Sequence, residues 1–248
     1  FDSFGWRIPF LIALPLLVVA VYLRSRLEES PVFRQLEESG EVEKSPIRTT
    51  FRDSWKQIII GMAAALLGVG GFYLVTAFCV WYGVNVLGYT NSLLLLGSMV
   101  AAAVEILALI WGGALGTKFG ASKVILWGGI ASAVVAVPAF FMFESGNPVL
   151  VVIAMTLAVS TLSLPYAASG TVLTGLFPAT TRYTGVGMAQ NAAGMLSGFI
   201  PLLATGFVAS AGDHWWPAAA MLVFLSLFTA FAGFVAPRMS VDLPGFKH

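Results

Sequence analysis

The chain has 248 residues, of which 58% are hydrophobic and only 10% are charged, and its mean hydropathy is +0.88. A soluble domain carries roughly a quarter charged residues, so this composition predicts an integral membrane protein. The net charge of +1 offers no basic face to a nucleic acid, so we expect no nucleic-acid partner. The single cysteine, Cys79, excludes an intrachain disulfide, and no cluster of cysteine and histidine suggests a metal site.

Apolar runs long enough to cross a bilayer recur along the whole chain. A spanning helix needs roughly 20 apolar residues. Seven runs meet this requirement, and they cover about 7–23, 56–82, 92–116, 124–143, 149–176, 183–209 and 215–236. The first run could instead be the core of a signal peptide, but RSRLEES follows it rather than a small-residue cleavage site. We therefore expect an all-α integral membrane protein with seven transmembrane helices that contact the lipid bilayer.

The one long connection, residues 24–55, follows the first span and mixes basic and acidic residues. Ser30 and Pro31 form a helix-start signal, and Val32, Phe33 and Leu36 then fall on one face at helical spacing. This pattern predicts a short amphipathic helix at the inner membrane interface, and the alternative is a solvated linker.

Basic residues divide unequally between the two sides of the predicted membrane. Lysine and arginine favour the cytoplasmic side of a membrane protein. One set of alternate loops, with the tail 237–248, contains 12 of the 13 basic residues, and the other side has only Arg7. The bias predicts a cytoplasmic C-terminus in a cell membrane and an N-terminal end that faces outside.

The stretch GGALGTKFGASK, residues 112–123, interrupts two apolar runs. We read its second part, GTKFGASK (116–123), as a tight cytoplasmic turn that Lys118 and Lys123 hold on the inner side. Glycines that stand four residues apart suit close packing of membrane helices. This spacing predicts helix contacts at two sets of glycines, which are Gly112, Gly116 and Gly120, and Gly194 and Gly198.

The same stretch resembles the cytoplasmic loop signature of the major facilitator superfamily, which reads G-x-L-x-D-[RK]-x-G-[RK]-[RK]. The residues that match are Gly113, Leu115, Lys118, Gly120 and Lys123. The chain departs from the signature at Thr117, where an aspartate is usual, and at Ala121 and Ser122, where basic residues are usual.

Two further stretches resemble one family within that superfamily, the metabolite:proton symporters, which include proline/betaine, shikimate, citrate and 2-oxoglutarate permeases. GWRIPFLIALPL (5–16) followed by RSRLEESPVF (24–33) is similar to the family's sixth span and the loop after it. LFPATTRYTGVGMAQNAAG (176–194) is similar to the L-F-P-x-x-x-R-Y-[ST]-[GA] loop before the eleventh span. The three stretches occur in the family's order and at its separation.

The resemblance implies that the chain corresponds to spans six to twelve of a twelve-span fold. Residues 1–23 would be the sixth span, 24–55 the cytoplasmic central loop, 56–236 the C-terminal six-helix bundle and 237–248 a cytoplasmic tail. Transporters of this fold rock two six-helix halves about a central site. We therefore expect the missing N-terminal half to be a partner of this one, and we do not expect this half to transport alone.

Glu105 is the only ionisable residue deep within a predicted span. It lies 11 residues before Gly116, so it is roughly 16 Å from the inner end at about 1.5 Å per residue. An ionisable group at that depth is costly and is a functional candidate by default. Glu105 is either a proton-coupling or substrate-contacting group, or a protonated structural residue that bonds to a neighbouring helix.

Further candidates come from the two spans that would line a central cavity by resemblance. The span 56–82 carries Tyr73 and Thr76 near its middle, and the span 149–176 carries Ser163 and Tyr166. Each of these polar groups would face substrate or bond to a neighbouring helix. Gln190 and Asn191, in the span 183–209, have the same two readings.

The remaining candidates lie near the predicted membrane surfaces. The cytoplasmic gate loop would consist of Gly113, Lys118, Gly120 and Lys123, and Arg182 is a gate or topology residue rather than a substrate ligand. Asp213 and His214 read as part of a solvated outer loop.

The sequence contains no nucleophile–base pair, phosphate loop or metal spacing, so we expect neither an enzyme nor a cofactor. The favoured hypothesis is a secondary transporter that moves a small polar metabolite, such as an organic acid, a betaine or an amino acid, by proton symport with alternating access. The alternative in the same superfamily is an efflux permease for an apolar compound. A membrane enzyme that uses Glu105 is the third hypothesis, and the lack of a partner acid counts against it.

Overall fold

The computed structural model describes residues 5–26 and 45–241, and the chain divides into two units, residues 1–44 and 45–248. In the first unit, a short turn of helix, η1 (Gly5–Arg7), leads into α1 (Ile8–Arg26). The predicted interfacial helix from Ser30 to Leu36 lies outside the described residues.

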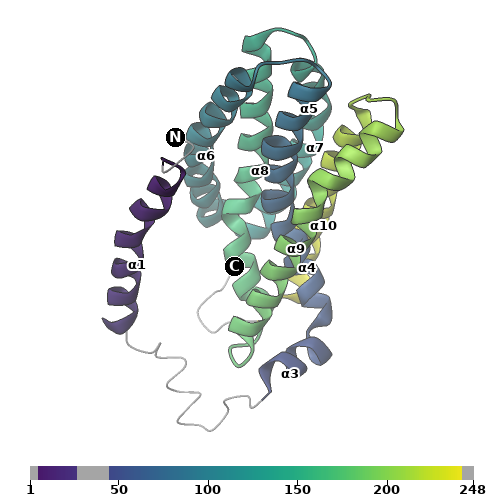
Figure 1. The fold of residues 1–248 in the computed structure, drawn as a ribbon. Helices are drawn as coiled ribbons and strands as arrows, with labels where there is room; N and C mark the ends of the chain where they lie inside the picture. Colours follow the sequence, from purple (N-terminus) through teal and green to yellow (C-terminus); the bar gives the residue numbers. More distant parts are fainter. Residues whose placement is uncertain (1–4, 27–44, 242–248) are drawn as a thin grey trace. The chain divides into compact units, whose positions relative to one another are not determined.

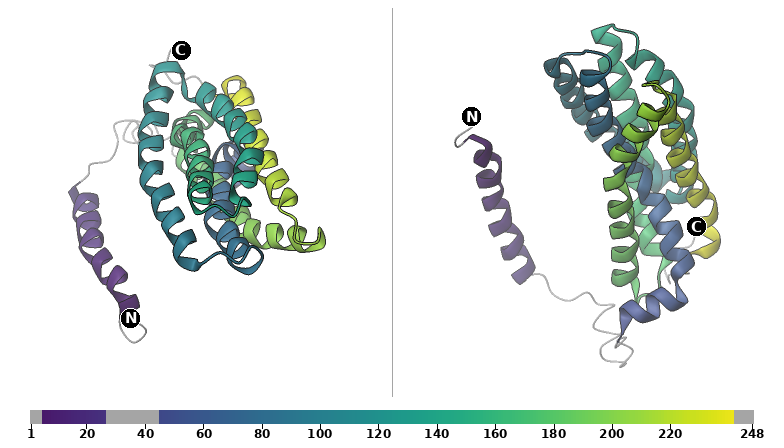
Figure 2. Two further views of the ribbon diagram at one scale, coloured as in Figure 1. Left: turned by 90° about the horizontal axis from the view of Figure 1, so that it is seen from above. Right: turned by 45° about the vertical axis from the view of Figure 1, so that its right-hand side comes forward.

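Six helical spans in the second unit are long and apolar enough to cross a membrane, and they match the last six predicted spans. They run side by side in Figures 1 and 2. The first span, Trp55–Asn85, consists of α4 (Trp55–Leu66), η2 (Leu67–Gly71), η3 (Leu74–Phe78) and α5 (Cys79–Asn85). The others are α6 (Asn91–Phe119), α7 (Ala121–Phe143), α8 (Pro148–Leu176), α9 (Arg182–Ser210) and α10 (Trp216–Met239). Helix α1 is not among the six, so a seventh span stays a prediction.

A short helix that we did not predict, α3 (Pro46–Asp53), precedes the first of these spans. Pro46 stands at its first position, where the missing N–H costs nothing, and the Thr50 hydroxyl donates to the Pro46 carbonyl at 2.6 Å. Arg52 donates two hydrogen bonds to the Asp53 carboxylate, at 2.7 and 3.0 Å, and thereby lowers the pKa of Asp53. Both side chains are exposed, so this pair adds little stability.

The turn between α6 and α7 is shorter than the sequence suggested. Helix α6 continues to Phe119 and α7 begins at Ala121, so only Gly120 lies between them. Gly120 has φ +94°, a left-handed conformation that glycine adopts without a Cβ clash. The predicted loop 116–123 is therefore helical except at this residue, and its two lysines stand on helices.

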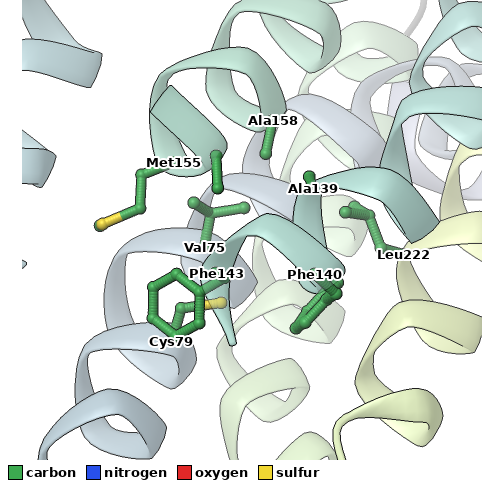
Figure 3. A pocket seen from close by; sticks show the side chains of 9 residues that line it. Val75, Cys79, Ala139, Phe140, Phe143, Met155, Ala158 and Leu222 are labelled. Carbon is green, nitrogen blue, oxygen red and sulfur yellow. The ribbon is translucent and has the colours of Figure 1, made fainter. Parts of the chain in front are cut away.

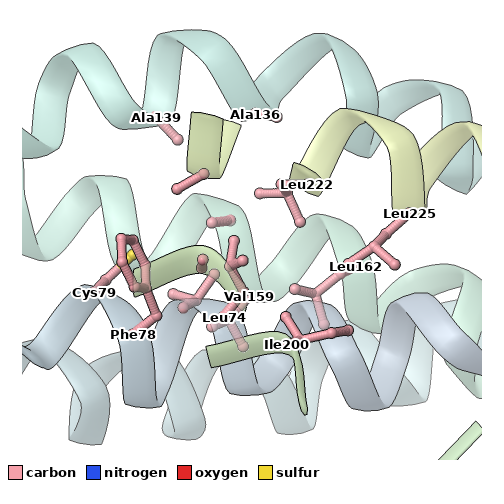
Figure 4. Packing of buried hydrophobic residues seen from close by; sticks show 14 of the residues in the cluster. Leu74, Phe78, Cys79, Ala136, Ala139, Val159, Leu162, Ile200, Leu222 and Leu225 are labelled. Carbon is pink, nitrogen blue, oxygen red and sulfur yellow. The ribbon is translucent and has the colours of Figure 1, made fainter. Parts of the chain in front are cut away.

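Small residues allow the helices of the bundle to approach closely. A Cβ at Gly129 would lie 2.7 Å from the Ser226 carbonyl oxygen and 2.8 Å from the Ala230 nitrogen, so the α7 and α10 backbones touch there. A Cβ at Gly112 would lie 2.5 Å from the Leu164 carbonyl oxygen, which joins α6 to α8 in the same way. Alanine and leucine side chains make up most of the buried core, together with valine and phenylalanine (Figure 4). In a bilayer, such close packing supplies much of the association between helices.

The glycine spacing predicted these contacts only in part. The contact at Gly112 is present, and Gly116 makes only an ordinary contact with Ala168 at 3.7 Å. At Gly194 and Gly198 the prediction is wrong for the described part of the chain, because no atom lies within 4 Å of where a Cβ would be. Sequence spacing places glycines on one face of a helix but does not say which face meets a neighbour.

We predict that Gly129→Ala loosens the contact between α7 and α10, because the added methyl would overlap backbone atoms that cannot rotate away. The expected cost is about 1–3 kcal/mol of stability. Thermal unfolding of detergent-solubilised protein measures it. Gly170→Ala on α8 is the matched control, since no atom lies within 4 Å of its Cβ position. Equal melting temperatures for the two variants would contradict the prediction.

Candidate functional site

Glu105 is the middle residue of α6 and stands 14 positions from each end of the helix, at Asn91 and Phe119. The rise of about 1.5 Å per residue places it roughly 21 Å from either end. Every other lysine, arginine, aspartate or glutamate in the six described spans lies within three residues of a span end. Glu105 is thus deeper than the sequence analysis placed it, because α6 extends beyond the predicted span.

The Glu105 carboxyl group meets a hydroxyl group of α8. Ser163 Oγ lies 2.9 Å from Glu105 Oε1 and 2.8 Å from the carbonyl oxygen of Val159, one turn earlier in α8. Ser163 is completely buried, whereas Glu105 is half-buried. The structure thus brings together two of the predicted candidates, and it does so across two different spans.

The part of α8 beside Ser163 contacts several other helices. Pro165 packs against Gly128 of α7, where a Cβ would lie 2.7 Å from the proline Cδ. Tyr166 covers Gly68 in η2 so closely that no Cβ would fit there. Because Pro165 has no N–H, it also removes one helical hydrogen bond from the middle of α8. The partner of Glu105, Ser163, therefore lies two residues before the point where Pro165 interrupts the backbone hydrogen bonds of α8.

The span that faces Tyr166 departs from regular α-helix over two stretches. Both η2 and η3 are π-helical. This conformation is rare in proteins, and where it occurs it is often part of a functional site. Tyr73 stands between the two stretches with 44% of its surface exposed, and Thr76 donates to the Phe72 carbonyl of its own helix at 2.7 Å. Thus Tyr166 packs on the bundle, Tyr73 points outward, and Thr76 bonds locally.

The two amides of α9 point in different directions. Gln190 is half-buried, and within the described residues its Oε1 has no hydrogen-bond donor. Asn191 is exposed and donates to the Gly187 carbonyl at 2.8 Å. A buried acceptor without a donor is uncommon in proteins. Gln190 is therefore free to accept a hydrogen bond from a ligand or a water molecule.

The predicted gate residues gather at the end of the bundle that carries the basic residues. Gly113 and Lys118 belong to α6, Lys123 to α7, and both lysines are exposed. Arg182 begins α9 and donates to the Phe177 carbonyl at 3.3 Å, while its buried Nη2 has no acceptor among the described residues.

Thr117, which stands at the aspartate position of the signature, donates to the Ala114 carbonyl of α6 at 2.8 Å. Its hydroxyl group therefore serves its own helix rather than a neighbouring one.

At the opposite end, a buried tyrosine joins segments that the sequence analysis left apart. The hydroxyl of Tyr82 lies 3.1 Å from Glu144 Oε1 and 2.9 Å from the carbonyl oxygen of Asp213. Asp213 has φ +62° in the turn between α9 and α10. Our reading of this turn as merely solvated was incomplete, because its backbone is held by Tyr82. The aromatic residue at the end of a span was the only available signal.

A small cavity lies beside η3 and α5, with a volume of about 20 Å³. Its nine lining residues are apolar, and Figure 3 shows how the side chains of Val75, Cys79, Met155 and Leu222 surround it. A volume of this size holds about one water molecule, and this lining offers such a molecule no partner. The cavity is therefore a packing defect and not a place for a metabolite.

We predict that Tyr82→Phe lowers the melting temperature, because the loops that contain Glu144 and Asp213 lose their shared hydrogen-bond donor. A loss of about 1 kcal/mol is expected for one net hydrogen bond. Tyr183→Phe is the control, since Tyr183 is 93% exposed. A Tyr82→Phe variant as stable as this control would show that the junction contributes nothing.

No protein-family model matches the chain. An ectoine/proline transporter of Corynebacterium glutamicum is 29% identical over 243 residues, which are 94% of this chain and 47% of that protein. A proline/betaine transporter of Escherichia coli is 26% identical over 237 residues, 90% of this chain and 46% of that protein.

A citrate-proton symporter of Klebsiella pneumoniae is 28% identical over 214 residues, which are 86% of this chain and 48% of that protein. The chain spans about half the length of the curated relatives that it matches. These relatives are transporters rather than enzymes, as the sequence predicted. The resemblance read from the motifs to the metabolite/proton symporters of the major facilitator superfamily is confirmed, since the chain is similar over most of its length to transporters of small metabolites, among them a citrate-proton symporter.

Proposed function

We propose that this chain forms the C-terminal half of a secondary transporter that moves a small polar metabolite across the cytoplasmic membrane by proton symport. The observation that carries the proposal is the Glu105 carboxyl group at the midpoint of α6, bonded to Ser163 of α8. An acid at this depth is costly, and proton relays in transporters are built from such residues. The names of the relatives, which include a citrate-proton symporter, support the same activity.

The cargo that we propose is an organic acid, a betaine or an amino acid. Relatives are named as transporters of ectoine and proline, of proline and betaine, and of citrate. On this chain, Gln190 supplies an acceptor that has no donor among the described residues. A polar cargo with an N–H or O–H group would satisfy it, whereas an apolar efflux substrate would leave it unpaired.

Alternating access is the proposed mechanism, in which this bundle would rock against the remaining half of the transporter. The π-helical stretches η2 and η3 interrupt the first span of the bundle, and Pro165 interrupts α8 where Tyr166 packs on Gly68. Kinks in long helices commonly occur at such features. We propose that these two spans bend as the cavity opens and closes.

We also propose that the end that carries Lys118, Lys123 and Arg182 faces the cytoplasm, with the C-terminus on the same side. Helix α10 ends beside α8 at this end, where the Val241 N–H donates to the Gly175 carbonyl at 2.9 Å. The distribution of lysine and arginine in the sequence supports this orientation.

We predict that Glu105→Gln separates substrate movement from the proton gradient. The amide keeps the size of the side chain but cannot release a proton. In cells that express the complete transporter, accumulation of labelled proline, betaine or citrate should become insensitive to a protonophore. Exchange of labelled for unlabelled substrate should continue, because it needs no net proton movement.

Glu105→Asp, which retains a titratable carboxyl group, is the matched control and should remain sensitive to the protonophore. A Glu105→Gln variant that accumulates substrate as the wild type does, with the same sensitivity, would refute the proposed role of Glu105. Accumulation that increases when the proton gradient is reversed would favour export over symport.

A further inference from the structure

The Ser163 hydroxyl group has more acceptors near it than it can serve. Val159 O and Glu105 Oε1 lie 2.8 and 2.9 Å from Ser163 Oγ. A hydroxyl group carries one hydrogen, a carbonyl oxygen only accepts, and an ionised carboxylate also only accepts. With Glu105 ionised, Ser163 therefore donates to one of these oxygens and leaves the other contact without a proton.

Protonation of Glu105 removes this conflict. The carboxyl O–H then donates to Ser163 Oγ, and the Ser163 O–H donates to the Val159 carbonyl, so both short contacts become hydrogen bonds. Ser163 is completely buried, so no water molecule takes part in the bonds of its hydroxyl group. We infer that Ser163 is a positioning residue: its hydroxyl group holds neutral Glu105, which carries the coupling proton, against α8. The inference rests on the proposed function of Glu105.

Ser163 lies close to the residues through which α8 contacts the rest of the bundle, so a change in its bond to Glu105 can affect those contacts. Pro165 removes a backbone hydrogen bond two residues later, and Tyr166 lies one turn further along α8 against Gly68 of η2. The turn of α8 that gains or loses the bond to Glu105 is thus the turn that contacts the π-helical span. Ser163 therefore links the protonation of Glu105 on α6 to the contact between the two spans that we propose to bend.

No other titratable group competes for this role within the described residues. The helices that pack against α6 carry Tyr166 on α8, Lys123 on α7, and Cys79 and Tyr82 on α5, and none of them is a hydrogen-bond partner of Glu105. Lys118 lies on α6 itself, 13 residues further along, which is about 20 Å at 1.5 Å per residue. Among the described residues, the protonation of the Glu105 carboxyl group therefore depends chiefly on its contact with the Ser163 hydroxyl group.

The test is the pH profile of uptake by the complete transporter, measured for Ser163→Ala. Loss of the hydroxyl group removes the hydrogen bond between Ser163 and Glu105. The external pH at half-maximal uptake should therefore shift by about one unit, a tenfold change in proton concentration that corresponds to one lost hydrogen bond. Ser163→Thr keeps the hydroxyl group and should restore the wild-type profile.

Ser160→Ala is the matched control. Ser160 stands one turn earlier on α8 and also donates to its own helix, to Thr156 O at 2.6 Å, but it has no partner on α6 in the described structure. Its pH profile should equal that of the wild type. If Ser163→Ala and Ser160→Ala have the same midpoint, the inference about Ser163 is wrong.

An infrared measurement gives a second readout that does not depend on transport. The C=O stretch of the protonated Glu105 carboxyl, assigned as the band absent in Glu105→Gln, should move to higher frequency in Ser163→Ala because a hydrogen bond is lost. An unmoved band overturns the inference even if uptake is impaired. Absence of any band that Glu105→Gln removes, with unchanged coupling in that variant, would instead refute the proposed function of Glu105.

Discussion

The bundle has to accommodate a carboxyl group, that of Glu105, at the midpoint of an apolar span. Hydrocarbon offers no hydrogen bonds, so every polar group in a span must find its partner inside the protein. Backbone groups find theirs within helices, and most serine and threonine hydroxyls in the spans bond to a carbonyl one turn earlier. A carboxyl group has no such local solution, and Glu105 reaches across to Ser163 on α8.

Helix α8 is the element through which this interaction acts on the bundle. Its middle contacts α6 at Gly112, α7 at Gly128 and η2 at Gly68, each time at a glycine that leaves no room for a side chain. Such contacts permit little gradual adjustment, because they involve backbone and ring atoms rather than flexible side-chain ends. A change in the bond between Ser163 and Glu105 is therefore a change beside three close contacts of α8 with its neighbours.

The sequence predicted the six spans well because a long apolar run is almost sufficient to define a membrane helix, and it identified Glu105 because a charge in such a run is conspicuous. It did not predict which partner each polar group would have. Glu105 and Ser163 are 58 positions apart, and Tyr82 and Asp213 are 131 apart, so only the folded chain shows these pairs. It also misjudged the length of the turn at Gly120, since polar residues such as Thr117 and Lys118 are compatible with the last turn of a helix.

The most direct test of the central claim is the movement of protons that substrate itself drives. In a lightly buffered suspension of proteoliposomes that contain the complete transporter, addition of substrate should make the outside medium more alkaline as protons enter with it. This signal is expected for the wild type and should be absent for Glu105→Gln, although that variant still exchanges substrate. An alkalinisation of equal size in the variant would contradict the claim that Glu105 carries the coupling proton.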